Sequence, residues 1–122
     1  MAHVTSANLV YVTAKADWEA CLATAKAENK VTIVDFFAQW CGPCKVIATV
    51  YESLAREHPN IYFLKVDVDS PEMTSITEAC GITAMPTFQV FVNGVKVDDL
   101  VGASQDKLKA LVAKYANAAP AQ

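Results

Sequence analysis

The sequence predicts an α/β domain whose central mixed sheet has five strands and is flanked by four helices, in the order βαβαβαββα. First, segments of strand type alternate with segments of helical spacing, which favours parallel strands joined by right-handed crossovers. Second, residues 31–37 are almost continuously apolar, which is typical of a strand buried on both faces. Third, Asn93-Gly94 separates two apolar segments and predicts a closing antiparallel hairpin.

The first half of the chain contains two predicted strands and two predicted helices. Residues 9–12 form a short apolar strand, and residues 31–37 form the buried one. A second helix begins at a pair of cysteines, runs to about Glu57 and ends at His58-Pro59-Asn60. The first helix covers about residues 16–29, because apolar side chains recur there at i, i+3, i+4 and i+7, at Trp18, Cys21, Leu22 and Ala25.

The middle of the chain continues the alternation with a strand and a helix. Residues 61–68 have the β-branched and aromatic composition of a strand. The helix after it starts at Ser70-Pro71-Glu72, with Ser70 as the N-cap and proline at the first helical position. We expect it to stop at Gly81.

The last part of the chain completes the sheet and adds a final helix. Residues 87–92 and 95–101 flank the hairpin turn. Ser104 is expected to cap a helix with an apolar face, and the tail from about residue 117 is predicted to be loose. Residues 1–122 are therefore predicted to form a single domain.

Composition excludes several classes of function. Of the 122 residues, 53% are hydrophobic and 19% are charged, and the formal net charge of −3 gives no basic surface for nucleic acid or an anionic membrane. The longest apolar runs are too short to span a membrane, and the first eight residues lack the features of a signal peptide. Four cysteines are too few for a secreted disulfide scaffold. We therefore predict a cytoplasmic protein, with an organellar location after removal of a transit peptide as the alternative.

Cys41 and Cys44 form a CxxC motif at the junction of a predicted strand and helix. Such a pair converts between dithiol and disulfide by attack of a thiolate on a neighbouring sulfur. The N-terminus of the helix favours a thiolate at Cys41, which we expect to be the accessible nucleophile, with Cys44 one turn later as the resolving thiol. The alternative is a zinc knuckle, which needs four clustered ligands, whereas Cys21 and Cys80 are isolated.

Asp35 interrupts the apolar strand that precedes this motif. Burial disfavours an ionised carboxylate, so the pKa of Asp35 should rise until the group can hold a proton near neutral pH. Asp35 is therefore a candidate general acid or base for the nearby thiols. The alternative is an aspartate that faces outward on an alternating strand.

Residues 40–45, Trp-Cys-Gly-Pro-Cys-Lys, together with the order of the elements, resemble the thioredoxin family over about residues 9–115. The resemblance implies the thioredoxin fold and a monomeric, general protein-disulfide reductase without a bound cofactor. It implies that a thioredoxin reductase recycles the Cys41–Cys44 disulfide with electrons from NADPH or ferredoxin, and that peroxiredoxins, methionine sulfoxide reductases and ribonucleotide reductase are targets. It is also carried by Val34-Asp35-Phe36, Lys65-Val66-Asp67, Met85-Pro86-Thr87-Phe88 and Gly102.

The resemblance also implies roles for individual residues. Asp35 would lie beneath the disulfide and help to deprotonate Cys44, and Lys65 would pair with Asp35, although a solvent-facing lysine is the alternative. The Met85-Pro86 bond would be cis, and the backbone of Met85 would bind an extended substrate by strand addition. The apolar surface for substrates would consist of Trp40, Ala84, Met85, Pro86, Gly102 and Ala103.

The two residues between the cysteines bear on the direction of electron flow. Gly42-Pro43 carries no positive charge to hold the reduced thiolate, and this active-site turn argues for a reductant. The rivals are an oxidase or isomerase, and a binding module that uses the apolar surface without turnover.

Two further positions leave alternatives open. Cys80 resembles a regulatory cysteine of some animal relatives, or it is a small buried hydrophobe. Thr49 occupies the position where relatives commonly have a helix-kinking proline, so the helix either runs straighter or bends through a bond from the threonine hydroxyl to an earlier carbonyl.

Overall fold

The structure of this protein is a computed structural model that describes residues 3–116. The tail that the sequence predicts to be loose, from about residue 117, lies outside the described residues. Among the described residues, no helix is both long enough and apolar enough to cross a membrane.

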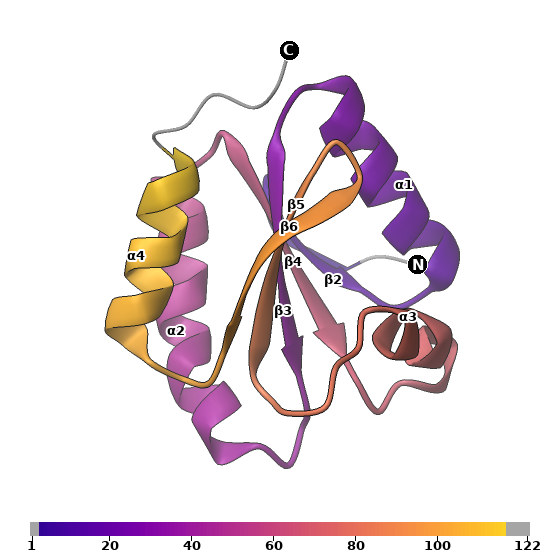
Figure 1. The fold of residues 1–122 in the computed structure, drawn as a ribbon, viewed down its shortest axis with the longest axis vertical. Coiled ribbons are helices and arrows are strands. Elements are labelled where there is room, and N and C mark those ends of the chain that lie inside the picture. Colours follow the sequence, from indigo (N-terminus) through magenta and orange to yellow (C-terminus); the bar gives the residue numbers. More distant parts are fainter. Residues whose placement is uncertain (1–2, 117–122) are drawn as a thin grey trace.

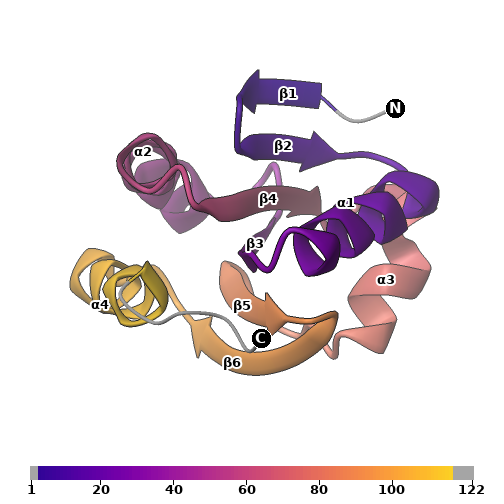
Figure 2. The same ribbon diagram turned by 90° about the horizontal axis from the view of Figure 1, so that it is seen from above.

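Six strands form one mixed sheet in the order β1-β2-β4-β3-β5-β6, which is visible in Figure 2. Strands β2, β4 and β3 are parallel, while β1, β5 and β6 each pair antiparallel with a neighbour. The five predicted strands are confirmed, and β1 adds an unpredicted sixth strand at the edge beside β2. The strands are β1 (His3–Ser6), β2 (Leu9–Val12), β3 (Val31–Phe37), β4 (Ile61–Asp67), β5 (Thr87–Val92) and β6 (Val95–Val101).

The four predicted helices are confirmed and cover both faces of the sheet. Helices α2 and α4 lie on one face and α1 and α3 on the other (Figures 1 and 2). The third helix begins as a 3₁₀ turn, η1 (Pro71–Met73). Ser70 is at the N-cap position as predicted, but its side chain makes no capping bond. The helices are α1 (Lys15–Ala27), α2 (Gly42–Glu57), α3 (Thr74–Ala79) and α4 (Gln105–Ala116).

The sheet separates two apolar cores. Beneath α2 and α4, the largest fully buried side chains include Tyr51, Phe63 and Phe88, and the ring centroids of Tyr51 and Phe63 are 5.3 Å apart. Beneath α1 and α3, Trp18 and Phe36 pack in the second core. Because side chains alternate along a strand, neighbouring residues of β3 contribute to opposite cores, and this alternation places Asp35 on the α2 side.

The turn and cap signals in the second half of the chain have their predicted geometry. Asn93 and Gly94 have φ angles of 54° and 80°, as a tight hairpin turn of this kind requires. The Ser104 hydroxyl oxygen accepts the backbone N–H of Lys107 at 3.2 Å and caps α4. Gly81, with a φ of 70°, follows the end of α3.

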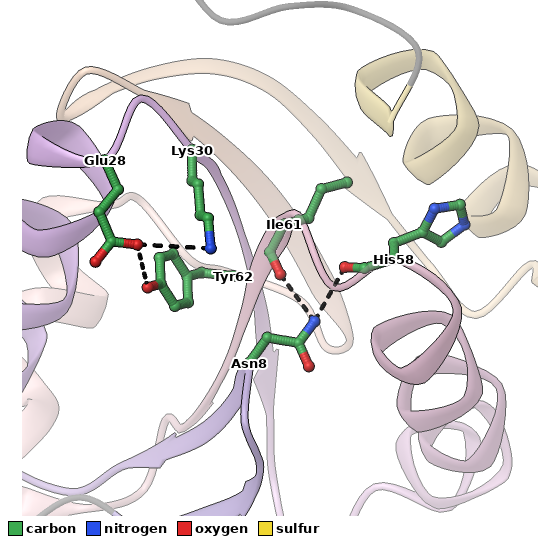
Figure 3. A network of polar contacts seen from close by, with 6 residues as sticks. All are labelled: Asn8, Glu28, Lys30, His58, Ile61 and Tyr62. Carbon is green, nitrogen blue, oxygen red and sulfur yellow. Dashed lines mark hydrogen bonds and ion pairs between the residues drawn. The ribbon is translucent and has the colours of Figure 1, made fainter.

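Asn8 joins the C-terminal end of α2 to the sheet, as Figure 3 shows. Its amide nitrogen donates to the backbone carbonyls of Ala55 at 2.8 Å, His58 at 3.0 Å and Ile61 at 2.9 Å. The carbonyls of Ala55 and His58 belong to the end of α2, where a helix leaves carbonyls without an i+4 partner, whereas that of Ile61 belongs to the start of β4. Asn8 thus fixes where α2 ends relative to β4.

Candidate active site

The two cysteines of the CxxC motif lie where β3 has ended and α2 begins. They form a disulfide with their Cα atoms 5.3 Å apart. Cys41 is the N-cap residue of α2, and its Sγ accepts the backbone N–H of Cys44 at 3.1 Å. The first-turn N–H groups and the helix dipole both favour negative charge at this sulfur. The structure therefore stabilises a thiolate at Cys41 once the disulfide is reduced.

In the disulfide form neither cysteine is widely exposed. Cys41 is 4% exposed and Cys44 is 3% exposed, and both pack with Ala38, Phe37 and Met85. The sequence predicts that Cys41 is the accessible member of the pair, and the structure shows only this small difference between them. A partner must therefore approach along the surface formed by the neighbouring side chains to reach either sulfur.

Trp40 dominates that surface. It is 69% exposed, and its indole N–H donates to an Asp69 carboxylate oxygen at 2.8 Å. The backbone N–H of Asp69 in turn donates to Asp67 at 2.9 Å, and the amide of Gln39 reaches the other Asp67 oxygen at 3.3 Å. These bonds hold the indole in one orientation beside the disulfide. Sequence reasoning missed Asp69, because nothing in its local pattern links it to a tryptophan 29 positions earlier.

The loop before β5 also contacts the cysteines. The Met85-Pro86 peptide bond is cis, as the family resemblance implies, and the half-buried Met85 packs against the two cysteines. The backbone N–H of Gly102, whose φ is 108°, donates to the Pro86 carbonyl at 2.9 Å. Ala84 is exposed, whereas Ala103 packs toward the core beneath α2 and α4. The structure thus joins Met85, Pro86 and Gly102 to the site and turns Ala103 partly away from it.

Asp35 lies beneath the disulfide side of α2. The residue is 1% exposed, and among the described residues its Oδ1 has no hydrogen-bond partner. Burial raises the pKa of Asp35 to about 7, and the nearby positive charge of Lys65 opposes part of this rise. The burial excludes the outward-facing alternative. Asp35 and Cys44 line the same cavity of about 210 Å³, so a proton held at Asp35 faces the space beside the resolving cysteine.

Lys65 stands next to Asp35 in the register of β4 and β3. Its ammonium group lies 3.8 Å from a Glu52 carboxylate oxygen and 5.1 Å from the centroid of the Phe37 ring. Within residues 3–116, the ion pair of Lys65 is with Glu52 and none joins it to Asp35. Its side chain is 16% exposed, so it is not simply a solvent-facing strand lysine. Glu52 was not singled out from the sequence, although it follows Cys44 by eight positions, about two helical turns.

The remaining thiols and Thr49 stand apart from this cluster. Cys21 and Cys80 are free thiols of intermediate burial, and burial raises the pKa of each. The part of the chain that the structure describes contains no group of three or more His, Cys, Asp or Glu side chains arranged to hold a metal ion.

Helix α2 is continuous through Thr49, whose hydroxyl donates to the Val46 carbonyl at 3.3 Å. This is the side-chain bond that the sequence offered as one alternative to the kinking proline.

Comparisons with known proteins agree with this geometry. Residues 9–114 match the sequence model of the family described as thioredoxin. A "Thioredoxin H-type" of Chlamydomonas reinhardtii is 56% identical over 112 residues, covering 91% of this chain and 97% of that protein. "Thioredoxin 1" of Plasmodium falciparum is 47% identical over 105 residues, covering 86% and 95%. The crystal structure of a poplar thioredoxin h superposes with a TM-score of 0.86 at 34% identity, covering 91% of this chain and 98% of that one.

These similarities, with the disulfide at the start of α2, identify a thiol-disulfide oxidoreductase. Proteins of this kind use the redox-active cysteine pair without a bound cofactor, act on disulfide-containing proteins, and depend on a thioredoxin reductase for recycling. The chain belongs to the thioredoxin family.

Proposed function

We propose that the protein reduces disulfides in other proteins and that Cys41 makes the first attack. The Cys41 thiolate bonds to one sulfur of the target disulfide, and the other target sulfur leaves as a thiolate. The resulting mixed disulfide joins Cys41 to the target. The observation that carries this assignment is the 3.1 Å bond from the Cys44 N–H to the Cys41 sulfur at the helix N-terminus, because it favours a thiolate at that atom.

In the second step of the proposed reaction, Cys44 is the resolving thiol and Asp35 accepts its proton. Once Asp35 takes the Cys44 proton, the Cys44 thiolate attacks the Cys41 sulfur, the target leaves with its second thiolate, and the Cys41–Cys44 disulfide forms. Two electrons pass to the target, whose two thiolates take up protons. The cavity lined by both Asp35 and Cys44 supports this assignment, as does the pKa of Asp35 of about 7, which suits proton exchange near neutral pH.

The surface around the disulfide supports a general rather than a selective reductase. Trp40 is exposed beside the cysteines, and Met85 supplies a backbone next to the cis proline where an extended chain can pair. Such contacts do not depend strongly on the target's sequence. We include peroxiredoxins, methionine sulfoxide reductases and ribonucleotide reductase among the targets, and NADPH or ferredoxin as the electron source of the recycling reductase.

The experiment that tests these roles compares two active-site variants with a matched free-cysteine variant. Reduction of insulin disulfides should be lost in Cys41→Ser and retained in Cys80→Ser, which removes a thiol outside the disulfide. Cys44→Ser should accumulate mixed disulfides through Cys41, visible as dithiothreitol-sensitive adducts on a gel. Turnover by Cys41→Ser with an unchanged rate would contradict the assignment. Partner binding without turnover by the unaltered protein would favour the binding module.

Three further properties belong to the same proposal. We infer that residues 1–122 act as one domain, that the protein is monomeric and that it works in the cytoplasm. The two free thiols, Cys21 and Cys80, support a reducing compartment, since thiols persist there. Light scattering of the reduced protein should give a mass near 13.2 kDa, and cell fractionation should recover the protein with cytosolic markers.

A further inference from the structure

A row of side chains crosses three strands beneath the active-site helix. Tyr11 of β2 is in register with Lys65 of β4, and Lys65 is in register with Asp35 of β3. All three line the cavity that Cys44 also lines. Because neighbours across a sheet project from the same face, the side chains of Lys65 and the buried Asp35 start one strand spacing apart on the same side of the sheet.

Helix α2 crosses above this row with a stripe of its own. Cys44, Ala48 and Glu52 recur every four residues, so they follow one side of the helix. Cys44 and Ala48 line the cavity, and Glu52 continues the stripe as far as Lys65, with 3.8 Å between their charged groups. The Phe37 ring lies 5.1 Å from the same ammonium. Among the described residues, Lys65 is therefore paired with Glu52 and not with its register neighbour Asp35.

We propose that Glu52 is a positioning residue of the disulfide exchange reaction, which acts by holding Lys65 and so limiting how strongly the lysine charge stabilises ionised Asp35. The interaction between two charges falls with their separation and rises in a poorly solvated site. The cavity of about 210 Å³ gives the lysine side chain room to turn inward. Without Glu52, the ammonium would lose its paired carboxylate, and Asp35, its register neighbour, would be the buried carboxylate that it can approach across the cavity; Asp67 of β4 is another carboxylate on this face.

Other charged and titratable groups also lie at or near the cavity. Tyr11 and Lys45 line it from β2 and α2, and the buried Tyr51 hydroxyl of α2 bonds to the Ile33 carbonyl at 3.0 Å. Burial raises the pKa of Tyr11, and the negative charge of Asp67, at the end of β4, adds to this rise. None of these groups forms the ion pair with Lys65, so the proposal concerns the Glu52–Lys65 contact alone.

The test is a double-mutant cycle that is read from the carboxyl carbon of Asp35 by NMR titration of the oxidised protein. Glu52→Gln should lower the titration midpoint of Asp35 by about 1 pH unit, because the lysine charge can move closer. In a Lys65→Met background the same substitution should lower it by less than half as much. Glu57→Gln, which removes the same charge from the exposed last residue of α2, is the matched control and should leave the midpoint unchanged.

Two results of the double-mutant cycle would overturn the proposal. One is an equal shift from Glu52→Gln with and without Lys65, which would make Glu52 a remote charge that does not act through the lysine. The other is no shift in either background. Glu52→Asp retains the charge on a shorter side chain, so its Asp35 midpoint should lie closer to that of the unaltered protein than to that of Glu52→Gln. A midpoint equal to that of Glu52→Gln would also count against the proposal.

The effect of Glu52→Gln on the pH–rate profile rests on the proposed acid–base role of Asp35. It therefore tests that role separately from the positioning of Lys65 by Glu52. In Glu52→Gln, the acid limb of the pH profile for insulin reduction should move to lower pH together with the NMR midpoint. A moved NMR midpoint with an unmoved rate profile would contradict the acid–base role of Asp35 and leave the Glu52–Lys65 positioning intact. An unmoved midpoint would overturn the positioning, whatever the rate.

Discussion

Replacing Asp35 with asparagine should make the oxidised protein more stable, and the gain should depend on pH. The residue is 1% exposed, and its pKa is about 7 compared with an ordinary value of 3.8. Between these two values the native protein keeps a proton that the unfolded chain has lost. A native state that binds more protons loses stability as the pH rises. The destabilisation starts near pH 4 and is complete just above pH 7.

The size of the effect follows from the shift in the pKa. A difference of about three units, at about 1.4 kcal/mol per unit, gives about 4 kcal/mol of stability that the ionised carboxylate removes above pH 7. Asparagine carries no charge, so Asp35→Asn should avoid this loss. Its amide adds a contribution of its own, but that contribution does not vary with pH. The decisive quantity is therefore the slope, about 1.4 kcal/mol per pH unit between pH 4 and 7.

The assay is urea unfolding of both oxidised proteins at each pH from 4 to 9. The difference in the free energy of unfolding, variant minus unaltered protein, should rise with pH up to 7 and then level off. Asp106→Asn, on the exposed first turn of α4, removes the same charge from a solvated position and should change stability by less than about 0.5 kcal/mol. A difference that stays flat from pH 4 to 9 would refute the raised pKa of Asp35.

Three further substitutions test the supports of the site by urea unfolding. Asn8→Ala removes hydrogen bonds to three backbone carbonyls and should destabilise the protein by about 2 kcal/mol, whereas unchanged stability would mean that water replaces the amide. Tyr51→Phe leaves two buried carbonyls without the hydroxyl and should lose about 1–2 kcal/mol; a more stable variant would contradict those bonds. Thr49→Pro should lose about 3 kcal/mol and some helical circular dichroism, since α2 is unbroken there, and an equally stable variant would show that the helix already accommodates a kink.

The sequence predicts most of the fold because local signals and burial agree. The apolar strand at residues 31–37, the Asn93-Gly94 turn and the Ser104 cap each have one dominant local cause, and each is present. Strand β1 could not be predicted in the same way. In the part of the chain that the structure describes, this four-residue strand pairs with β2 alone, and a short edge strand depends on its neighbour rather than on a pattern of its own.

In the site, too, some features could be predicted from the sequence and others could not. The positions of Cys41, Cys44 and Asp35 follow from the sequence because they rest on a motif and on a charge inside an apolar strand. Two other contacts could not be predicted from the sequence, the Glu52–Lys65 pair and the bond from Trp40 to Asp69. Each joins side chains of separate elements, whose approach depends on the packing of α2 or of the loop after β4. The limited exposure of Cys41 likewise depends on tertiary packing around it.

The reduction potential of the Cys41–Cys44 pair tests the proposed direction of electron flow most directly. Equilibration against a dithiothreitol redox series, followed by thiol trapping, should give a two-electron couple at about −270 mV, the value typical of thioredoxin. A value of about −180 mV, typical of protein disulfide isomerase, would contradict the reductase and favour an oxidase or isomerase.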